Sequence, residues 1–175
     1  MLIAEKDGKF FQSCVIKRAG LAIKHVVPKT EEAYNCLIRE HEILKTLDQD
    51  CFIRLAWAEV KDDSYTIATE WVDGIRLHEA KNIDYERIKE GCGNILFELK
   101  EKGIRHRDIW DKNIILRDGN PVLIDFGWAI FDGDPAIYDS ELPHANDDLA
   151  VKRLLNGFRH LRQPQSIYKE LVAQK

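Results

Sequence analysis

The sequence lacks several features that would place the protein in a specialised class. It has no apolar run of membrane-spanning length, and its first six residues, MLIAEK, are too short and too charged for a signal peptide. Acidic residues outnumber basic ones, 30 against 26, and the formal net charge is −4. This charge gives no reason to expect direct contact with nucleic acid.

Closely spaced cysteines are also missing. The four cysteines are scattered, and no two have the short spacing of a metal site: Cys14, Cys36, Cys51 and Cys92. We therefore predict reduced thiols and a cytoplasmic location. The sequence has no internal repeat and no low-complexity linker, and 45% of its residues are hydrophobic. A single globular domain over residues 1–175 is expected.

The most informative stretch covers residues 106–127 and reads HRDIWDKNIILRDGNPVLIDFG. Two apolar runs flank a cluster of turn formers at 117–121, which predicts a β-hairpin. Asn113 precedes the first arm and Asp125 follows the second, so the hairpin brings both to one end. Their oxygens suit Mg²⁺, which usually binds one or two carboxylates together with substrate phosphates. Asp108, on the loop entering the hairpin, is placed to meet a hydroxyl that approaches this metal.

In order and spacing, this stretch resembles the catalytic and metal-binding loops of eukaryotic-type protein kinases. The resemblance is carried by His106-Arg107-Asp108, by Asn113 and by Asp125-Phe126-Gly127. It implies that Asp108 is catalytic, that Asn113 and Asp125 bind Mg²⁺, and that ATP is the phosphoryl donor. The alternative is a hairpin with ordinary turn carboxylates. A lone Asp-Phe-Gly would favour that alternative, but the combined motifs argue against it.

A lysine and a glutamate upstream extend the resemblance. Residues 21–24, LAIK, resemble the family strand whose final lysine contacts the α- and β-phosphates of ATP. Thr30 can cap a helix running to Leu47, and helical spacing places Glu40 on its apolar face. A buried carboxylate needs a partner, for which Lys24 is the obvious candidate. Lys24 is thus predicted to be catalytic and, together with Glu40, to act in ATP binding.

The N-terminal region departs from the family at one point. Strands are predicted over the first 27 residues, with turns at Asp7-Gly8 and at 18–20. The family has a glycine-rich phosphate loop here, whereas residues 6–13 contain one glycine where the family pattern has three. The predicted backbone cradle for phosphates is correspondingly weak.

Two further strands are predicted at 52–60 and 64–71. The second leads into a stretch that resembles the inter-lobe hinge of kinases, where backbone groups hold the adenine. The resemblance implies that Glu70 and Val72 contribute to nucleotide binding.

Two helices are expected in the C-terminal half. Asp84 can cap a helix that ends before Gly103, and Gly91 and Gly93 within it are interpreted as close-packing sites. Asn146 or Asp147 begins a last amphipathic helix. Its inner face is predicted to consist of Val151, Leu154, Leu155, Phe158 and Leu161.

Within the catalytic stretch, two positions raise separate questions. Trp110 stands where protein kinases usually carry a lysine that contacts the γ-phosphate, and Lys112 is a candidate replacement. Arg107 is expected to brace the catalytic loop through backbone carbonyls. The alternative is that it pairs with a phosphorylated side chain, for which Tyr138 and Ser140 are available in the segment that follows.

We predict an α+β fold of the minimal two-lobed kinase-like type. It comprises a small β-rich N-lobe (about 1–70), a hinge (about 70–74) and a truncated helical C-lobe (about 75–175). Because kinases continue well beyond this length, the usual platform for a peptide substrate is expected to be missing. The lipopolysaccharide-core sugar kinases and the small kinase of the tRNA threonylcarbamoyl-modification complex share such a shortened lobe.

The predicted function is Mg-ATP-dependent phosphoryl transfer to a hydroxyl group. A protein serine or threonine is the preferred acceptor, because Arg107 accompanies the catalytic aspartate and many small-molecule kinases of this fold lack that arginine. A lipopolysaccharide or glycan sugar is the alternative acceptor. A pseudokinase that serves as a nucleotide-binding scaffold is the alternative from another class. A partner protein that completes the truncated C-lobe is also expected.

Overall fold

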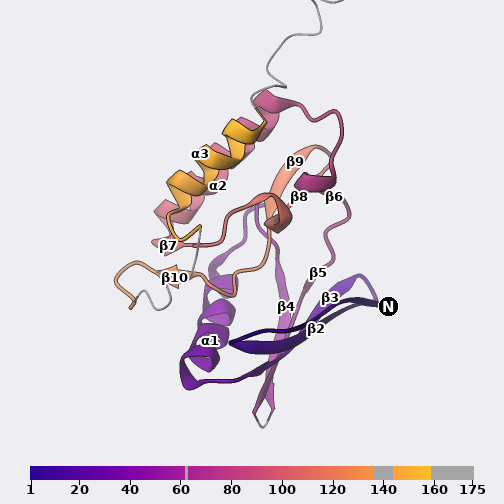
Figure 1. Ribbon diagram of the computed structural model, residues 1–175, viewed down its shortest axis with the longest axis vertical. Coiled ribbons are helices and arrows are strands. Elements are labelled where there is room, and N and C mark those ends of the chain that lie inside the picture. Colours follow the sequence, from indigo (N-terminus) through magenta and orange to yellow (C-terminus); the bar gives the residue numbers. More distant parts are fainter. Residues whose placement is uncertain (62, 136–143, 159–175) are drawn as a thin grey trace, which may run out of the picture.

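The computed structural model of this chain describes residues 1–61, 63–135 and 144–158. Figure 1 shows an N-terminal sheet with helix α1 beside it, and a second group of elements in which helices α2 and α3 lie side by side. The helices are α1 (Glu31–Thr46), α2 (Tyr85–Glu101) and α3 (Asp147–Gly157), with short 3₁₀ helices η1 (Leu77–Glu79) and η2 (Asp111–Asn113). The predicted α+β class is confirmed.

The N-terminal sheet is antiparallel and has the strand order β1-β2-β3-β5-β4. Its strands are β1 (Leu2–Asp7), β2 (Phe11–Arg18), β3 (Leu21–Pro28), β4 (Leu55–Lys61) and β5 (Ser64–Glu70). The predicted turn between β2 and β3 is present, and Ala19 and Gly20 there have positive φ angles of 51° and 76°. Glycine adopts this conformation without a steric penalty.

The prediction that a strand begins at residue 52 is wrong, because β4 begins at Leu55. Phe52 is fully buried and meets the ring of Phe126 edge-on, with 6.0 Å between centroids. Beside it, the Ile53 N–H donates to the Leu123 carbonyl at 3.1 Å. This segment therefore joins the sheet to the hairpin instead of extending a strand.

Helix α1 begins where the sequence predicts. The Thr30 hydroxyl accepts a hydrogen bond from the Ala33 N–H at 3.1 Å, and the helix is followed by Leu47 as its C-terminal cap. Its buried face consists of Ala33, Cys36, Leu37, Glu40, Ile43 and Leu44. Glu40 is the one charged residue on this face, with 3% of its surface exposed.

Helix α2 is capped by Asp84, whose carboxylate accepts the Arg87 N–H at 3.1 Å. A Cβ at Gly91 would lie 2.3 Å from the Pro121 ring, so the predicted close packing is confirmed there. Gly93 has no atom within 4 Å of a Cβ position, and the same prediction for Gly93 is wrong. Gly91 therefore lies on the side of α2 that packs closely against the hairpin.

Helix α3 is capped by Asn146, whose side chain accepts the Leu149 N–H at 2.9 Å. Its inner face agrees with the prediction as far as the helix is described: Val151 is buried, and Leu154, Leu155 and Phe158 pack on the core. Leu161, Tyr138 and Ser140 lie outside the described residues.

The predicted hairpin consists of β8 (Ile114–Arg117) and β9 (Asn120–Leu123). Two positive φ angles, 51° at Asp118 and 82° at Gly119, form its turn, as in the tight turns that suit twisted strands. The shorter strands are β6 (Ile75–Arg76), which pairs with β8, and β7 (Ile104–Arg105), which pairs with β10 (Ile130–Phe131). One continuous apolar core runs from the sheet through Phe52 and Phe126 to helices α2 and α3.

The four cysteines carry free thiols, as predicted. Across the described ranges, none of the helices combines the length and the apolar character needed to cross a bilayer. The cytoplasmic location stays a prediction.

Candidate active site

A cleft of about 460 Å³ lies between the N-terminal sheet and the hairpin of β8 and β9. Its apolar part is lined by side chains from β3, the segment after β5 and the hairpin, among them Ala22, Val72 and Ile115. Its polar end contains Lys24, Glu40 and Asp125. One end of the cleft thus suits a flat apolar ring, and the other end carries the charged groups.

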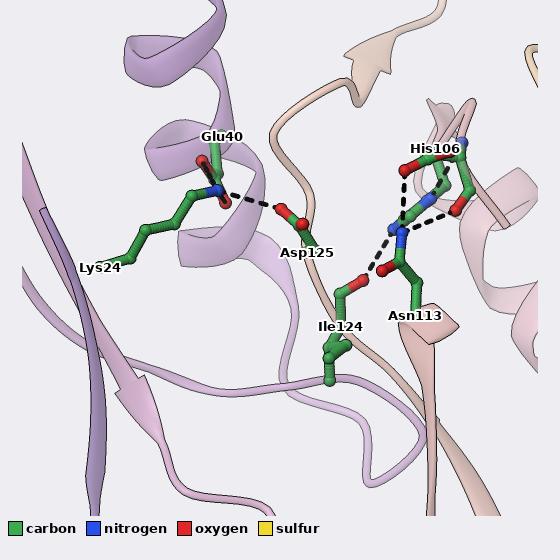
Figure 2. A network of polar contacts seen from close by, with 7 residues as sticks. Lys24, Glu40, His106, Asn113, Ile124 and Asp125 are labelled. Carbon is green, nitrogen blue, oxygen red and sulfur yellow. Dashed lines mark hydrogen bonds and ion pairs between the residues drawn. The ribbon is translucent and has the colours of Figure 1, made fainter. Parts of the chain in front are cut away.

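At the polar end, Lys24 bridges two carboxylates that come from different elements. Its Nζ lies 3.2 Å from both carboxylate oxygens of Glu40 on α1 and 3.0 Å from Oδ1 of Asp125 (Figure 2). Burial alone would lower the pKa of Lys24, but the two carboxylates outweigh it and raise that pKa. The Lys24 ammonium in turn holds the pKa of Asp125 below its usual range. The predicted pairing of Lys24 with Glu40 is confirmed by this geometry.

Asp108 and Asn113 form a second polar pair on the loop before β8. The Asn113 amide nitrogen donates to the Asp108 carbonyl at 3.0 Å and to the Asp108 carboxylate at 2.9 Å. Burial raises the pKa of Asp108 to about 6, and the nearby Asp125 acts in the same direction. A carboxylate with a raised pKa is better suited to accept a proton from a hydroxyl.

The hairpin brings Asn113 and Asp125 to the same end, as predicted. Ile114 pairs with Leu123, and the Ile124 N–H donates to the Asn113 carbonyl at 2.9 Å. In Figure 2 the Asp125 side chain points toward Lys24, whereas Asn113 points toward the loop that carries His106. The two side chains therefore share one end of the hairpin without touching.

These donors fit a magnesium ion. The Asn113 amide donates through its nitrogen, which leaves its oxygen to face a cation. Asp125 accepts from Lys24 through Oδ1, and its other oxygen could bind a metal. Hard oxygen donors of this kind, few in number and completed by phosphates, suit Mg²⁺. Within the ranges the structure describes, no cluster of three His, Cys, Asp or Glu side chains offers a closed metal site.

His106 is fully buried and fixes the backbone around the site. Its Nε2 lies 3.2 Å from the Ile124 carbonyl, and its Nδ1 lies 3.3 Å from the Asp108 N–H. A carbonyl can only accept and an N–H can only donate, so the ring is neutral with its proton on Nε2. Burial lowers the pKa of His106, which agrees with that assignment. His106 thereby links the loop of Asp108 to the segment that leads into Asp125.

Asp147 is a site residue whose role the sequence reasoning missed. Its carboxylate accepts the backbone N–H groups of His106 and Arg107, both at 2.7 Å. The sequence indicated only a helix start at this position, and a contact over 40 residues leaves no local signal. Asp147 therefore positions the backbone of the loop that carries Asp108.

Arg107 is fully buried and has a positive φ of 67°. As predicted, it donates to a backbone carbonyl: its Nη1 bonds the Trp128 oxygen at 3.1 Å. It thus connects the catalytic loop to the segment after Asp125.

The two predicted hinge residues line the cleft. The Glu70 carboxylate is engaged by Arg117, whose guanidinium lies 3.2 and 3.4 Å from its two oxygens. The Glu70 N–H also has a partner, because it donates to the Arg54 carbonyl at 2.9 Å, so the Glu70 carbonyl is the group that could meet a nucleotide. Val72 is buried beside it.

Lys112, the candidate replacement for a lysine at position 110, lies over the ring of Trp110. Its Nζ is 4.9 Å from the centroid of the Trp110 ring. The ring of His144 is also stacked on this indole, with 5.8 Å between centroids and an interplanar angle of 21°. Lys112 therefore contacts the indole that occupies this position.

Comparison with known proteins supports the resemblance found in the sequence. Residues 8–140 match the family model described as protein kinase domain. The chain is 44% identical over 120 residues to serine/threonine-protein kinase D of Synechocystis sp., an alignment that covers 65% of this chain and 24% of that protein. It is 37% identical over 78 residues to the KEOPS complex subunit Bud32 of Pyrococcus abyssi, which covers 42% of this chain and 36% of that protein.

The chain thus spans well under half the length of either relative. The family model nevertheless covers most of this chain, and the predicted resemblance is confirmed. Since the matched segment contains the cleft residues from Lys24 to Asp125, we conclude that this chain belongs to the protein kinase family.

Proposed function

We propose that this chain transfers the terminal phosphoryl group of ATP to a hydroxyl group in the presence of Mg²⁺. The observation that carries the proposal is the position of Lys24 between Glu40 and Asp125. These residues come from β3, α1 and the end of the hairpin, and they meet at the polar end of an otherwise apolar cleft. Phosphoryl transfer depends mainly on positioning and charge neutralisation, which such an arrangement provides.

On the nucleotide side, the apolar part of the cleft would receive the adenine, with backbone groups of Glu70 and Val72 at its edge. Lys24 would hold the α- and β-phosphates, and Glu40 would keep the lysine in place. This division corresponds to an N-lobe of about 1–70, a hinge of about 70–74 and a C-lobe of about 75–175. A Cβ at Gly74 would lie 2.4 Å from the Leu116 carbonyl, so the chain runs tightly over the hairpin at the end of this hinge.

On the acceptor side, Asp108 would orient the attacking hydroxyl and accept its proton. The hydroxyl oxygen forms a bond to the γ-phosphorus while the bond from that phosphorus to the β–γ bridging oxygen breaks. Asn113 and His106 fix Asp108 through the bonds described above, and Asp147 fixes the backbone before it. Asp125 and Asn113 would bind Mg²⁺, which neutralises negative charge on the phosphate oxygens when bound.

We propose a protein serine or threonine as the acceptor. The 44% identity to a protein named serine/threonine-protein kinase D supports this choice over a glycan sugar. The intact set of cleft residues also argues against a pseudokinase scaffold, because each residue has the neighbour that its role requires.

We further propose a partner protein over the exposed faces of α2 and α3. Phe97 on α2 and Leu149 on α3 are 61% and 43% exposed, which is unusual for large apolar side chains. The relative Bud32 is named as the subunit of a complex. Co-purification of the tagged chain, compared with a variant carrying Phe97→Ser and Leu149→Ser, tests this proposal.

The proposed reaction is tested with ATP labelled at the γ-phosphate. We expect Mg²⁺-dependent labelling of the chain itself or of a serine/threonine protein substrate, and thermal stabilisation by ATP that requires Mg²⁺. At 100 times the Kd, ATP should add about 2.7 kcal/mol to the free energy of unfolding. Labelling of a sugar fraction only would replace the protein acceptor with the glycan alternative. Binding of ATP without transfer to any acceptor would favour the scaffold.

A further inference from the structure

The lysine at the polar end of the cleft already has two carboxylate partners. The Lys24 ammonium is paired with both Glu40 and Asp125. A nucleoside triphosphate brings several further negative charges to this point. A lysine that is already paired with two carboxylates has less charge to offer the terminal phosphate.

Lys6 is placed to supply that support. It lies near the end of β1, paired in register with Ser13 on β2, and both residues line the cleft. Lys6 also lines a second cavity of about 360 Å³ beneath the turn between β1 and β2, where it again meets Lys24 and Asp125. Lys6 therefore lines the same two cavities as Lys24 and Asp125.

The turn that carries Lys6 is held over the site by aromatic contacts. The Trp128 ring, directly after the Asp125-Phe126-Gly127 motif, lies 5.5 Å from the ring of Phe10 and 5.4 Å from that of Phe11. On the other side of the turn, the Lys29 ammonium donates to the Gly8 carbonyl at 2.7 Å. These contacts fix a turn that has one glycine, so its position does not depend on the backbone flexibility of a glycine-rich loop.

Other cations near the site have partners elsewhere. Arg76, which also lines the cleft, donates to the Lys112 carbonyl. The Lys9 ammonium lies 4.9 Å from the centroid of the Phe10 ring, and Lys112 lies over Trp110. Arg107 is buried and bonds a backbone carbonyl. Lys6, by contrast, is exposed to the cleft.

We propose that Lys6 binds the terminal phosphate of the nucleotide and neutralises charge on the group that is transferred. This inference rests on the proposed kinase function and adds a residue to it. Lys24 would then hold the inner phosphates and Lys6 the outer one. The Lys6 ammonium would replace the backbone N–H groups that a glycine-rich turn offers to phosphates and that this glycine-poor turn offers less readily.

The test compares the affinities of ATP and ADP, each with Mg²⁺, by titration calorimetry. A charge-assisted contact to the γ-phosphate should be lost in Lys6→Gln, so the affinity for ATP should fall roughly tenfold to a hundredfold. The affinity for ADP should stay within about twofold, since ADP lacks that phosphate. Lys6→Arg should retain most of the preference for ATP. Lys45→Gln, an equal charge change on the exposed side of α1, should alter neither affinity.

Three outcomes decide the inference. An unchanged ratio of ATP to ADP affinity in Lys6→Gln overturns it, whether both affinities fall or neither does. A selective loss of ATP affinity with an unchanged melting temperature supports it. Failure of the wild-type chain to bind either nucleotide overturns the proposed function as well, which separates the two failures.

Discussion

At the scale of single residues, the backbone of the site is strained where the chemistry is proposed. Arg107 and Asp125 have positive φ angles of 67° and 63°, which residues with a Cβ rarely adopt. Each such conformation costs about 1–3 kcal/mol and persists only where the surroundings enforce it. Asp147 and His106 are the groups that enforce it here, through hydrogen bonds to the backbone on either side.

Asp147→Ala should therefore destabilise the chain strongly. The substitution leaves the N–H groups of His106 and Arg107 without their acceptor, at a cost of about 2–4 kcal/mol in the free energy of unfolding. Asp148→Ala is the matched control, because Asp148 is exposed and pairs only at the surface with Lys100. That change should cost at most about 1 kcal/mol. Urea unfolding of both variants measures the difference, and equal losses would contradict the assigned role of Asp147.

The cysteines provide a pH-dependent prediction at the same scale. Burial raises the pKa of Cys92 to about 12, so its reactive thiolate forms only as the pH rises toward that value. At pH 8 the thiolate fraction is on the order of one in ten thousand, and the thiol is also shielded. Iodoacetamide should leave Cys92 unmodified in the native chain and label it after unfolding, whereas the partly exposed Cys14 should react first. Rapid native labelling of Cys92 would mean that α2 opens locally.

Prediction of the site residues from sequence depended on local geometry. Glu40 could be assigned because helical spacing places it on the apolar face, where a buried acid requires a cation. Asp147 could not, because its partners lie about 40 residues away and helix-starting aspartates are common. The contact of Trp128 with Phe10 and Phe11 was missed for the same reason.

At the scale of elements, two glycines of α2 distinguish the effect of close packing on stability from that of helix propensity. A Cβ at Gly91 would overlap the Pro121 ring of β9, whereas a Cβ at Gly93 would meet open space. Turn chemistry made the boundaries of most elements predictable, including the caps of α1 and α2. The start of β4 was not predictable from sequence. Phe52 packs against the ring of Phe126, which is distant in the chain, and this contact has no local signal.

Gly91→Ala should destabilise the chain by about 1–3 kcal/mol, because the added methyl group forces α2 away from the hairpin. Gly93→Ala should be neutral or should stabilise by up to about 1 kcal/mol, since alanine favours the helix. Chemical denaturation of the two variants compares the same substitution two residues apart in one helix. A loss at Gly93 as large as that at Gly91 would show that helix packing does not distinguish them.

At the scale of the whole molecule, one continuous core joins the two groups of elements. Phe52 and Phe126 belong to this core, and Arg117 connects the hairpin to Glu70 at the end of β5. Lys24, Glu40 and Asp125 meet across the same boundary. Any change in the relative position of the two groups would alter these contacts, so the geometry of the cleft reports on the arrangement of the whole chain.

The central claim, that Asp108 serves phosphoryl transfer in this cleft, is tested most directly by γ-phosphate transfer in Asp108→Asn. The account predicts that transfer falls by about 10²–10⁴ while Mg-ATP binding stays near the wild-type value, because this carboxylate meets the acceptor. Asp118→Asn, the same change at the exposed turn of the same hairpin, should transfer phosphate at the wild-type rate. Equal transfer by wild type and Asp108→Asn would contradict the account.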